Sequence, residues 1–528
     1  MKSEPATRAP SGWVLLPFAL GGGLVGSLAF APFSWWPAAF VAVGVLAVVI
    51  GAAPRLRAAL GLGLAYGLAF NLVTIRWQIL IEVGSYLGLA LLQALFFALL
   101  GGLLWLVRRL RWAPLAAACC WVLVEALQAR VPFGGFSWTR LGYAVVDTPL
   151  SGLYPLAGAA LATFAVALVA HTAVWALSGR RRREFLMAAG VAVSVLALGA
   201  LGTLVPTTPT NRPTIDVGWV QGGSGGGGFY GLGEPGETTR RHAAQTRVLL
   251  GDADAGRVAK PAFIVWPENG TDNDPLLDPT TNKIVADVVA DAGVPLLLGV
   301  PTNGPGPGER QTTDLWWTNA GIGARYDKRN LVPFGEWIPF RDVLLPLIPT
   351  LQVIGDQAIP GTLPGVLSVQ DASGNPLKVG VAICYEVSFA DTMADAVTHG
   401  AEVMVVGSNN AMFQGSPQIE QQFAITRVRA AELRRQILVV TVSGLTGLIG
   451  ERGEITMRAP LQDAASGVVS LVRSDSRTPY VLGGWVFEWV AVALALAAAV
   501  AGAVAGRVRA GDRMAARSEP QEGDSTHG

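Results

Sequence analysis

Three residues of complementary chemistry each follow a short strand-like run between residues 206 and 481. Glu268 follows Phe263–Pro267, Lys328 follows a second run, and Cys384 ends the run Lys378–Ile383. A carboxylate can accept a proton, a thiolate can attack a carbonyl carbon, and an ammonium can stabilise the oxyanion that forms. Taken singly, the three are more typical of a loop acid, a surface lysine and a small buried hydrophobe. Their common position, 60 and then 56 residues apart, favours one shared site.

Cys384 is the one cysteine in this part of the chain, and it stands just before a helical pattern that starts near Ser388. The positive end of a helix dipole favours negative charge, so a thiol at a strand-to-helix turn gains thiolate character. The sequence therefore predicts a reactive thiol here. The other two cysteines, Cys119 and Cys120, lie in an apolar stretch and are expected to be packing residues.

An α/β domain must position these three residues. Charges appear every few residues from 206 to 481, and β-branched runs alternate with helical patterns, which is typical of buried sheets covered by helices. The predicted strands are Thr214–Val220, Ala262–Val265, Pro295–Val300, Lys378–Ile383, Glu402–Val406 and Ile437–Val442. The predicted helices are Asn282–Ala292, Ser388–His399 and Gln418–Arg435.

The composition places the rest of the chain in a membrane. The 528 residues include 15% charged and 51% hydrophobic residues, whereas a soluble domain carries roughly 25% charged residues. The net charge of +1 gives no support for a nucleic-acid partner, and three cysteines are too few for a disulfide scaffold. Apolar stretches close to the roughly 20 residues that cross a bilayer recur at 13–31, 35–53, 58–79, 84–107, 113–130, 155–178, 185–205 and 482–506.

These stretches divide the chain into five segments. We expect a cytoplasmic N-terminal tail (1–12), a bundle of seven transmembrane helices (13–205), the α/β domain (206–481), an eighth transmembrane helix (482–506) and a cytoplasmic, disordered tail (507–528). Arginines follow the second, fourth, sixth and eighth apolar stretches, and positive ends face the cytoplasm. The odd number of spans before residue 206 then puts the α/β domain on the extracytoplasmic face of the membrane.

Three strings around the candidate residues resemble the Glu-Lys-Cys motifs of the nitrilase, or carbon–nitrogen hydrolase, superfamily. They are Trp266-Pro267-Glu268, the run 326–336 that begins Tyr-Asp-Lys and ends Phe-Gly-Glu, and Cys384-Tyr385-Glu386. The resemblance implies an αββα sandwich. It also implies a triad in which Glu268 is the base, Lys328 stabilises the oxyanion and Cys384 is the nucleophile.

The membrane part narrows the resemblance to the apolipoprotein N-acyltransferase family. The segments 30–36, 133–138 and 141–143, with Trp121 and Glu125, are similar to that family, as is the arrangement of seven helices, a catalytic domain and one more helix. The resemblance implies a multi-pass enzyme of the bacterial plasma membrane that moves an acyl chain from a phospholipid, through a Cys thioester, to the α-amine of a diacylglyceryl lipoprotein. We expect no metal, no cofactor and a monomer.

Four further residues are candidates for supporting or substrate-binding roles. Glu336 is expected to orient Lys328 or Glu268, unless it is a loop acid. Tyr385 and Glu386 flank the nucleophile and are expected to shape the pocket, unless they are ordinary packing residues at a strand end. After a Gly-rich loop at Gly222–Gly228, Tyr230 or Phe229 stands where the family has a tryptophan. Two other departures from the family pattern are Ser137, in place of a proline, and Gln422, in place of a histidine.

Two other functions fit part of the pattern. A membrane-tethered amidase could use the same triad, although one anchoring helix would suffice for it, and a transporter would need intramembrane charges along a pathway, of which few are present. An acyltransferase also needs an apolar route by which lipids reach Cys384. The candidates for that route are Trp316, Trp317 and the segment Trp337–Leu351, although the two tryptophans could instead be core residues of a strand.

Overall fold

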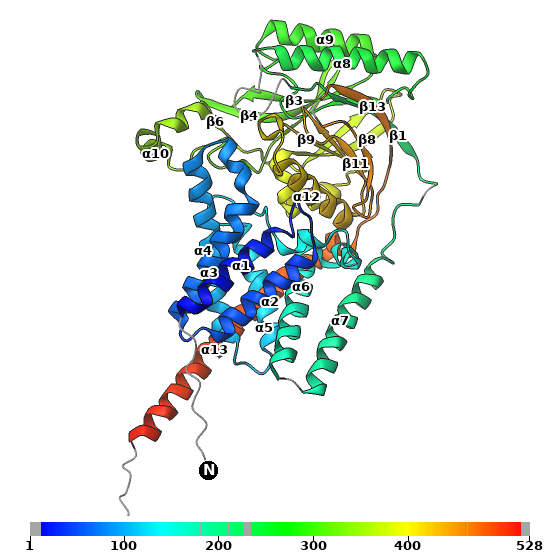
Figure 1. The fold of residues 1–528 in the computed structure, drawn as a ribbon. Helices are drawn as coiled ribbons and strands as arrows, with labels where there is room; N and C mark the ends of the chain where they lie inside the picture. The colour runs from blue at the N-terminus through cyan, green and yellow to red at the C-terminus, as the bar shows by residue number, and fades with distance from the viewer. Residues whose placement is uncertain (1–11, 180, 210, 225–233, 462, 519–528) are drawn as a thin grey trace, which may run out of the picture.

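The computed structural model describes residues 12–179, 181–209, 211–224, 234–461 and 463–518, so Tyr230 and most of the Gly-rich loop lie outside the described residues. A helical bundle forms one half of the molecule and a two-sheet domain the other, with α12 (Gln418–Leu433) between the sheets and the bundle (Figure 1). The chain passes from the bundle to the sheets after α7 (Arg182–Gly202) and returns in α13 (Val486–Ser518).

The bundle contains a helix at each apolar stretch that the sequence indicates. Among the residues that the structure describes, five helices are long and apolar enough to cross a membrane, namely α3, α4, α6, α7 and α13 with the residues directly before some of them. The other three have 16 residues each, and at 1.5 Å per residue they reach about 24 Å, less than a bilayer core of about 30 Å. The bounds not yet given are α1 (Gly12–Ser27), α2 (Pro37–Ala52), α3 (Leu56–Thr74), α4 (Val83–Val107), α5 (Ala113–Gln128) and α6 (Tyr154–Gly179).

Two features of the ends of the bundle differ from the sequence expectation. Helix α13 continues to Ser518, where the polar composition led us to expect a disordered tail from residue 507. The helices α1, α2 and α5 are shorter than the predicted spans because turns occupy residues 28–36 and 129–140, next to the helix ends.

The sheet domain is an αββα sandwich, as the sequence predicts. A seven-stranded sheet has the order β13-β1-β2-β3-β4-β5, with β6 beside β4, and a six-stranded sheet has the order β12-β11-β10-β9-β8-β7. Helices α8 (Glu237–Asp254) and α9 (Pro279–Ala292) cover the outer face of the first sheet, and α11 (Ala390–Thr398) and α12 lie on the other side of the second (Figure 1). The strands are β1 (Thr214–Gln221), β2 (Phe263–Trp266), β3 (Leu296–Asn303), β4 (Glu309–Thr318), β5 (Gly321–Asp327), β6 (Gln357–Ala358), β7 (Val366–Gln370), β8 (Pro376–Ile383), β9 (Val403–Ser408), β10 (Ile437–Thr441), β11 (Gly447–Ile449), β12 (Ile455–Arg458) and β13 (Ala465–Val472).

Three apolar layers hold the molecule together. Alternate strand residues such as Val217, Val265 and Val381 fill the space between the sheets, and their neighbours face the outer helices, as the two-residue period of a strand requires. The third layer is continuous from α11 and α12 into the bundle. The side of the sheet domain that carries α11 and α12 is therefore packed directly on the helices of the bundle.

Gln421 of α12 makes the polar part of this junction. Its Oε1 accepts hydrogen bonds from the indole N–H groups of Trp77 (2.9 Å) and Trp138 (2.8 Å), and its Nε2 donates to the carbonyls of Ala31 and Thr74 (2.9 Å each). Four bonds from one buried amide satisfy its hydrogen-bonding capacity. They fix α12 against three separate segments of the bundle.

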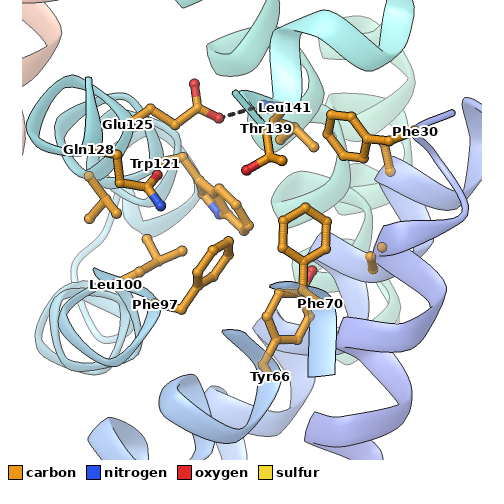
Figure 2. A pocket seen from close by; sticks show the side chains of 14 residues that line it. Phe30, Tyr66, Phe70, Phe97, Leu100, Trp121, Glu125, Gln128, Thr139 and Leu141 are labelled. Carbon is orange, nitrogen blue, oxygen red and sulfur yellow. Dashed lines mark hydrogen bonds between the residues drawn. The ribbon is translucent and has the colours of Figure 1, made fainter. Parts of the chain in front are cut away.

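Glu125, the intramembrane acid that the transporter interpretation would use, is held in place by its neighbours. It borders a small cavity inside the bundle and accepts a hydrogen bond of 2.6 Å from the backbone N–H of Leu141 (Figure 2). Thr163 and Arg140 also donate to it, at 2.7 and 3.3 Å. These bonds anchor the loop after α5, which is one of the bundle segments that contact the sheet domain.

Candidate active site

Lys328 lies at the centre of the site. It directly follows β5, and only 1% of its side chain is exposed. Its Nζ lies 3.0 Å from Oε1 of Glu268 and 2.8 Å from Oε1 of Glu336. Burial alone would lower the pKa of Lys328, but the two carboxylates outweigh it and hold the pKa above its usual value. The ammonium is therefore permanently charged at neutral pH.

Glu268 and Glu336 are each fixed by a backbone donor as well as by Lys328. Glu268 follows β2 and accepts the N–H of Asn409, just after β9, at 2.9 Å through its second oxygen. Glu336 accepts the N–H of Val332 at 2.7 Å. The sequence left open whether Glu336 orients Lys328 or Glu268 or is a loop acid. In the structure Glu336 contacts Lys328. The two acids thus share one ammonium.

Cys384 follows β8 and begins a 3-10 turn that ends at Ser388. Its φ of 53° lies in the left-handed region, which a non-glycine residue adopts at a cost and which is common at functional sites. Helix α11 begins only at Ala390. The predicted gain in thiolate character from a helix N-terminus is wrong, because burial and then the carboxylate of Glu268 raise the pKa of the Cys384 thiol. The thiol needs a base, and Glu268 is the adjacent one.

Glu386 joins the loop that carries Lys328 to the loop that carries Cys384. Its buried carboxylate accepts the hydroxyl of Tyr326 (2.8 Å) and the N–H groups of Arg329 (2.7 Å), Asn330 (3.2 Å) and Ile383 (2.8 Å). The sequence led us to expect Glu386 to shape the pocket. Its contacts instead make it a brace behind the site, since all four donors belong to backbone or side chains next to β5 and β8.

Tyr385 carries the contact between the site and the membrane bundle. Its ring stacks with those of Phe136 and Trp138, and its hydroxyl donates to the carbonyl of Gly135 at 2.9 Å. These three residues belong to the loop after α5. Tyr385, the residue next to the nucleophile, therefore packs on the membrane part of the chain and forms part of the contact between the sheet domain and the bundle.

Trp316 and Trp317 do not line a lipid route. Both lie on β4 and are buried, Trp316 between the two sheets and Trp317 under the outer helices. Consecutive residues of a strand point to opposite faces, and both faces of β4 are covered. We therefore correct the expectation for this pair.

The segment Trp337–Leu351 is exposed and apolar, in contrast to the tryptophans. It contains the short helix α10 (Arg341–Leu347), and its exposed residues include Phe340, Val343, Leu347 and Ile348. An open cavity of about 740 Å³ lies beside it, reaching Phe133 of the bundle loop and Arg329, Asn330 and Phe389 next to the site. The ring of Phe133 contacts Phe334, Trp337 and Phe340.

Gln422 is the contact that sequence reasoning missed. The sequence marked it only as a departure from a family pattern, yet its Nε2 lies 3.7 Å from Sγ of Cys384 and 3.0 Å from Oγ of Ser408.

Among the residues that the structure describes, no group of three or more His, Cys, Asp or Glu side chains could hold a metal ion.

Comparison with known proteins defines the class to which this fold and site belong. The family model described as carbon–nitrogen hydrolase matches residues 263–475, and that of the apolipoprotein N-acyltransferase N-terminal domain matches residues 22–172. A solved mutant of the Nesterenkonia AN1 amidase from the nitrilase superfamily is 15% identical, covering 53% of this chain and 95% of that chain with a TM-score of 0.37. By the match of the family model over residues 263–475, the sheet domain is that of a carbon–nitrogen hydrolase.

Relatives that match nearly the whole chain identify the family within this class. An apolipoprotein N-acyltransferase of Mycolicibacterium smegmatis is 31% identical over 465 residues, which cover 83% of this chain and 76% of that protein. One of Azotobacter vinelandii is 31% identical over 500 residues, covering 89% and 92%. The chain belongs to the apolipoprotein N-acyltransferase family.

The bonds of Glu386 lead to a first prediction. Gln in place of Glu386 keeps the shape but turns one acceptor into an N–H₂ group that faces a donor. We expect Glu386→Gln to lower the free energy of unfolding by about 1–3 kcal/mol, the usual cost of leaving a buried polar group unpaired, and to slow alkylation of Cys384. Thermal unfolding in detergent and thiol labelling measure the two effects. Glu420→Gln, which removes only a partly exposed ion pair with Arg458, is the control, and equal stability of both variants would contradict the bracing role.

Proposed function

We propose that the chain transfers a fatty acyl group from a membrane phospholipid to the α-amine of a diacylglyceryl-cysteine at the N-terminus of a lipoprotein. Family membership supports this reaction, since the relatives are named apolipoprotein N-acyltransferases. The observation that carries the proposal is the meeting of Glu268, Lys328 and Cys384 at the junction with the membrane helices.

In the first half-reaction, Glu268 takes the thiol proton as Sγ of Cys384 attacks the ester carbonyl. A carbon–sulfur bond forms, and the negative charge on the carbonyl oxygen is stabilised by the Lys328 ammonium and a backbone N–H near Tyr385. The ester carbon–oxygen bond then breaks. Glu268 returns the proton to the leaving oxygen, which departs as a lysophospholipid, and the acyl group remains on Cys384 as a thioester.

In the second half-reaction, the amine of the lipoprotein attacks the thioester carbonyl. The same ammonium stabilises the oxyanion, a carbon–nitrogen bond forms and the carbon–sulfur bond breaks. The proton lost by the amine passes to Glu268 and from there to the thiolate. The cycle is balanced, because each proton taken by Glu268 is returned and no other reagent is consumed.

The lipid substrates constrain where this chemistry can take place. Moving an acyl chain from the bilayer into water costs about 0.8 kcal/mol per CH₂, so both substrates are expected to keep their chains in the membrane. The exposed apolar segment 337–351 and the open cavity between it and Phe133 lie beside the site. We propose that this segment borders the route from the bilayer to Cys384.

The nucleophile assignment is tested by replacing Cys384. Cys384→Ala is expected to abolish acyl transfer in an assay with purified protein, phospholipid and a diacylated lipopeptide, while the thermal unfolding temperature is retained. Cys384→Ser should keep a trace at most, since an alkoxide forms far less readily than a thiolate near neutral pH. Turnover at the wild-type rate by the alanine variant would remove Cys384 from the mechanism, and hydrolysis of a small amide without acyl transfer would favour an amidase.

Membrane sidedness is a second proposal, supported by the arginine pattern. We propose that the sheet domain faces the extracytoplasmic side of the bacterial plasma membrane, where arginines are rare at span ends. A protease added to intact spheroplasts should cut within residues 214–472, with a cytoplasmic marker protein left whole. Cleavage only after lysis would reverse the topology and make an exported lipoprotein substrate untenable.

The lipid route gives a further prediction. Replacing Leu344, Leu345 and Ile348 together with Ser should lower the rate of acyl transfer from membrane phospholipid, because the segment would no longer contact acyl chains. Alkylation of Cys384 by a small water-soluble reagent should remain at the wild-type rate. Loss of both reactions would mean that the segment supports the fold, and retention of both would separate it from lipid access.

A further inference from the structure

Gln422 is a buried amide that contacts the reacting sulfur. It lies on α12 with 4% of its surface exposed, and its Nε2 is 3.7 Å from Sγ of Cys384, within the range of a hydrogen bond to the large sulfur atom. The same nitrogen donates to Oγ of Ser408 at 3.0 Å. An amide nitrogen has two hydrogens, so these two contacts use both of them.

The amide is oriented by its other partner. Nε2 of Gln418, one turn earlier on α12 and also buried, donates to Oε1 of Gln422 at 3.2 Å. With the oxygen engaged on that side, the N–H₂ group must face Cys384 and Ser408. Gln418 and Ser408 therefore orient the donor toward the sulfur, and neither of them belongs to the triad.

We propose that Gln422 is a further catalytic residue, which donates a hydrogen bond to Sγ of Cys384 and stabilises the thiolate. A donor that bonds to the charged form of an ionisable group favours that form. The thiolate occurs twice in the cycle, as the attacking group and as the group that leaves when the amine displaces it. Glu268 supplies and removes the proton, and Gln422 supports the sulfur while the proton is away.

The groups around Sγ of Cys384 explain why a neutral hydrogen-bond donor suits the position of Gln422. The sulfur already has the Lys328 ammonium nearby, and that charge is shared with the two carboxylates Glu268 and Glu336. A cationic side chain in place of Gln422 would lie in the buried layer between α12 and the sheet, where an unpaired charge is costly. An amide adds a donor without adding a charge.

The position of this donor is tied to the membrane bundle. The preceding residue, Gln421, makes four hydrogen bonds to bundle segments. Gln422 therefore lies one residue from the polar contact between the sheet domain and the bundle.

The test measures the reactivity of the thiol itself. Gln422→Met has a side chain of similar length without a donor, and we expect alkylation of Cys384 by iodoacetamide near pH 7 to fall about 10-fold or more, as for loss of a hydrogen bond to a charged group. The pH at half-maximal reactivity should rise, and kcat for acyl transfer should fall with little change in KM. Gln422→His, which keeps an N–H donor, should restore most of the rate. Gln245→Met, on α8 and bonded to Ser466, is the matched control and should react as the wild type.

Each outcome decides the proposal. Alkylation of Gln422→Met at the wild-type rate would overturn it, whether or not acyl transfer falls. Should that variant fail to fold, Gln422→Glu keeps the acceptor for Gln418 and can accept from Ser408, but it presents a carboxylate to the sulfur. Slower alkylation of this variant supports the proposal, and an unchanged rate rejects it. The proposal rests on Cys384 as the nucleophile of the proposed function, but alkylation needs no lipid, so failure of the acyl-transfer assignment would be visible separately in the Cys384→Ala assay.

Discussion

The site depends on one buried ammonium held by two carboxylates. A charge removed from water is costly unless it is paired and hydrogen-bonded, and Lys328 is almost fully buried between Glu268 and Glu336. The three residues come from the ends of β2 and β5 and from the loop after β5, so the cost of leaving any one unpaired forces these segments together. The same pairing keeps the ammonium charged beside the sulfur, where an oxyanion would form. Structural and chemical requirements are therefore met by the same three side chains.

The seating of the sheet domain on the membrane helices gives this site its relation to lipids. Tyr385, next to the nucleophile, packs on the loop 135–138, and Gln421 is bonded to Trp138 of the same loop and to two further segments of the bundle. The carbon–nitrogen hydrolase fold holds a Glu, a Lys and a Cys together. The contacts of Tyr385 and Gln421 place these three residues next to the apolar helices of the bundle. A soluble amidase has no use for such a surface, whereas an acyltransferase with two membrane-bound substrates does.

Sequence reasoning predicted the parts of the site that are local and missed those that depend on packing. Glu268, Lys328 and Cys384 each end a strand, and strand ends can be read from short β-branched runs. The roles of Glu386 and Gln422 could not be predicted, because three of the four donors to Glu386 lie 56 to 60 residues away in the chain and Cys384 lies 38 residues from Gln422. These residues meet only once the strands and α12 are in place. Trp316 and Trp317 were open to two interpretations since a strand covered on both faces has no polar alternation. The raised pKa of the Cys384 thiol could not be predicted for the same reason, because a helix start can be recognised in the sequence whereas the burial of the sulfur cannot.

We propose that the acyl chain rests on Cys384 between the two half-reactions. The most direct measurement is mass spectrometry of the peptide that contains Cys384, after incubation of the purified protein with a phospholipid that carries isotope-labelled acyl chains and without any acceptor. We expect one labelled acyl group on Cys384, released by neutral hydroxylamine and lost when a diacylated lipopeptide is added. Labelling of the lipopeptide amine by a protein whose Cys384 stays unmodified throughout, or an acyl group on a different residue, would contradict it.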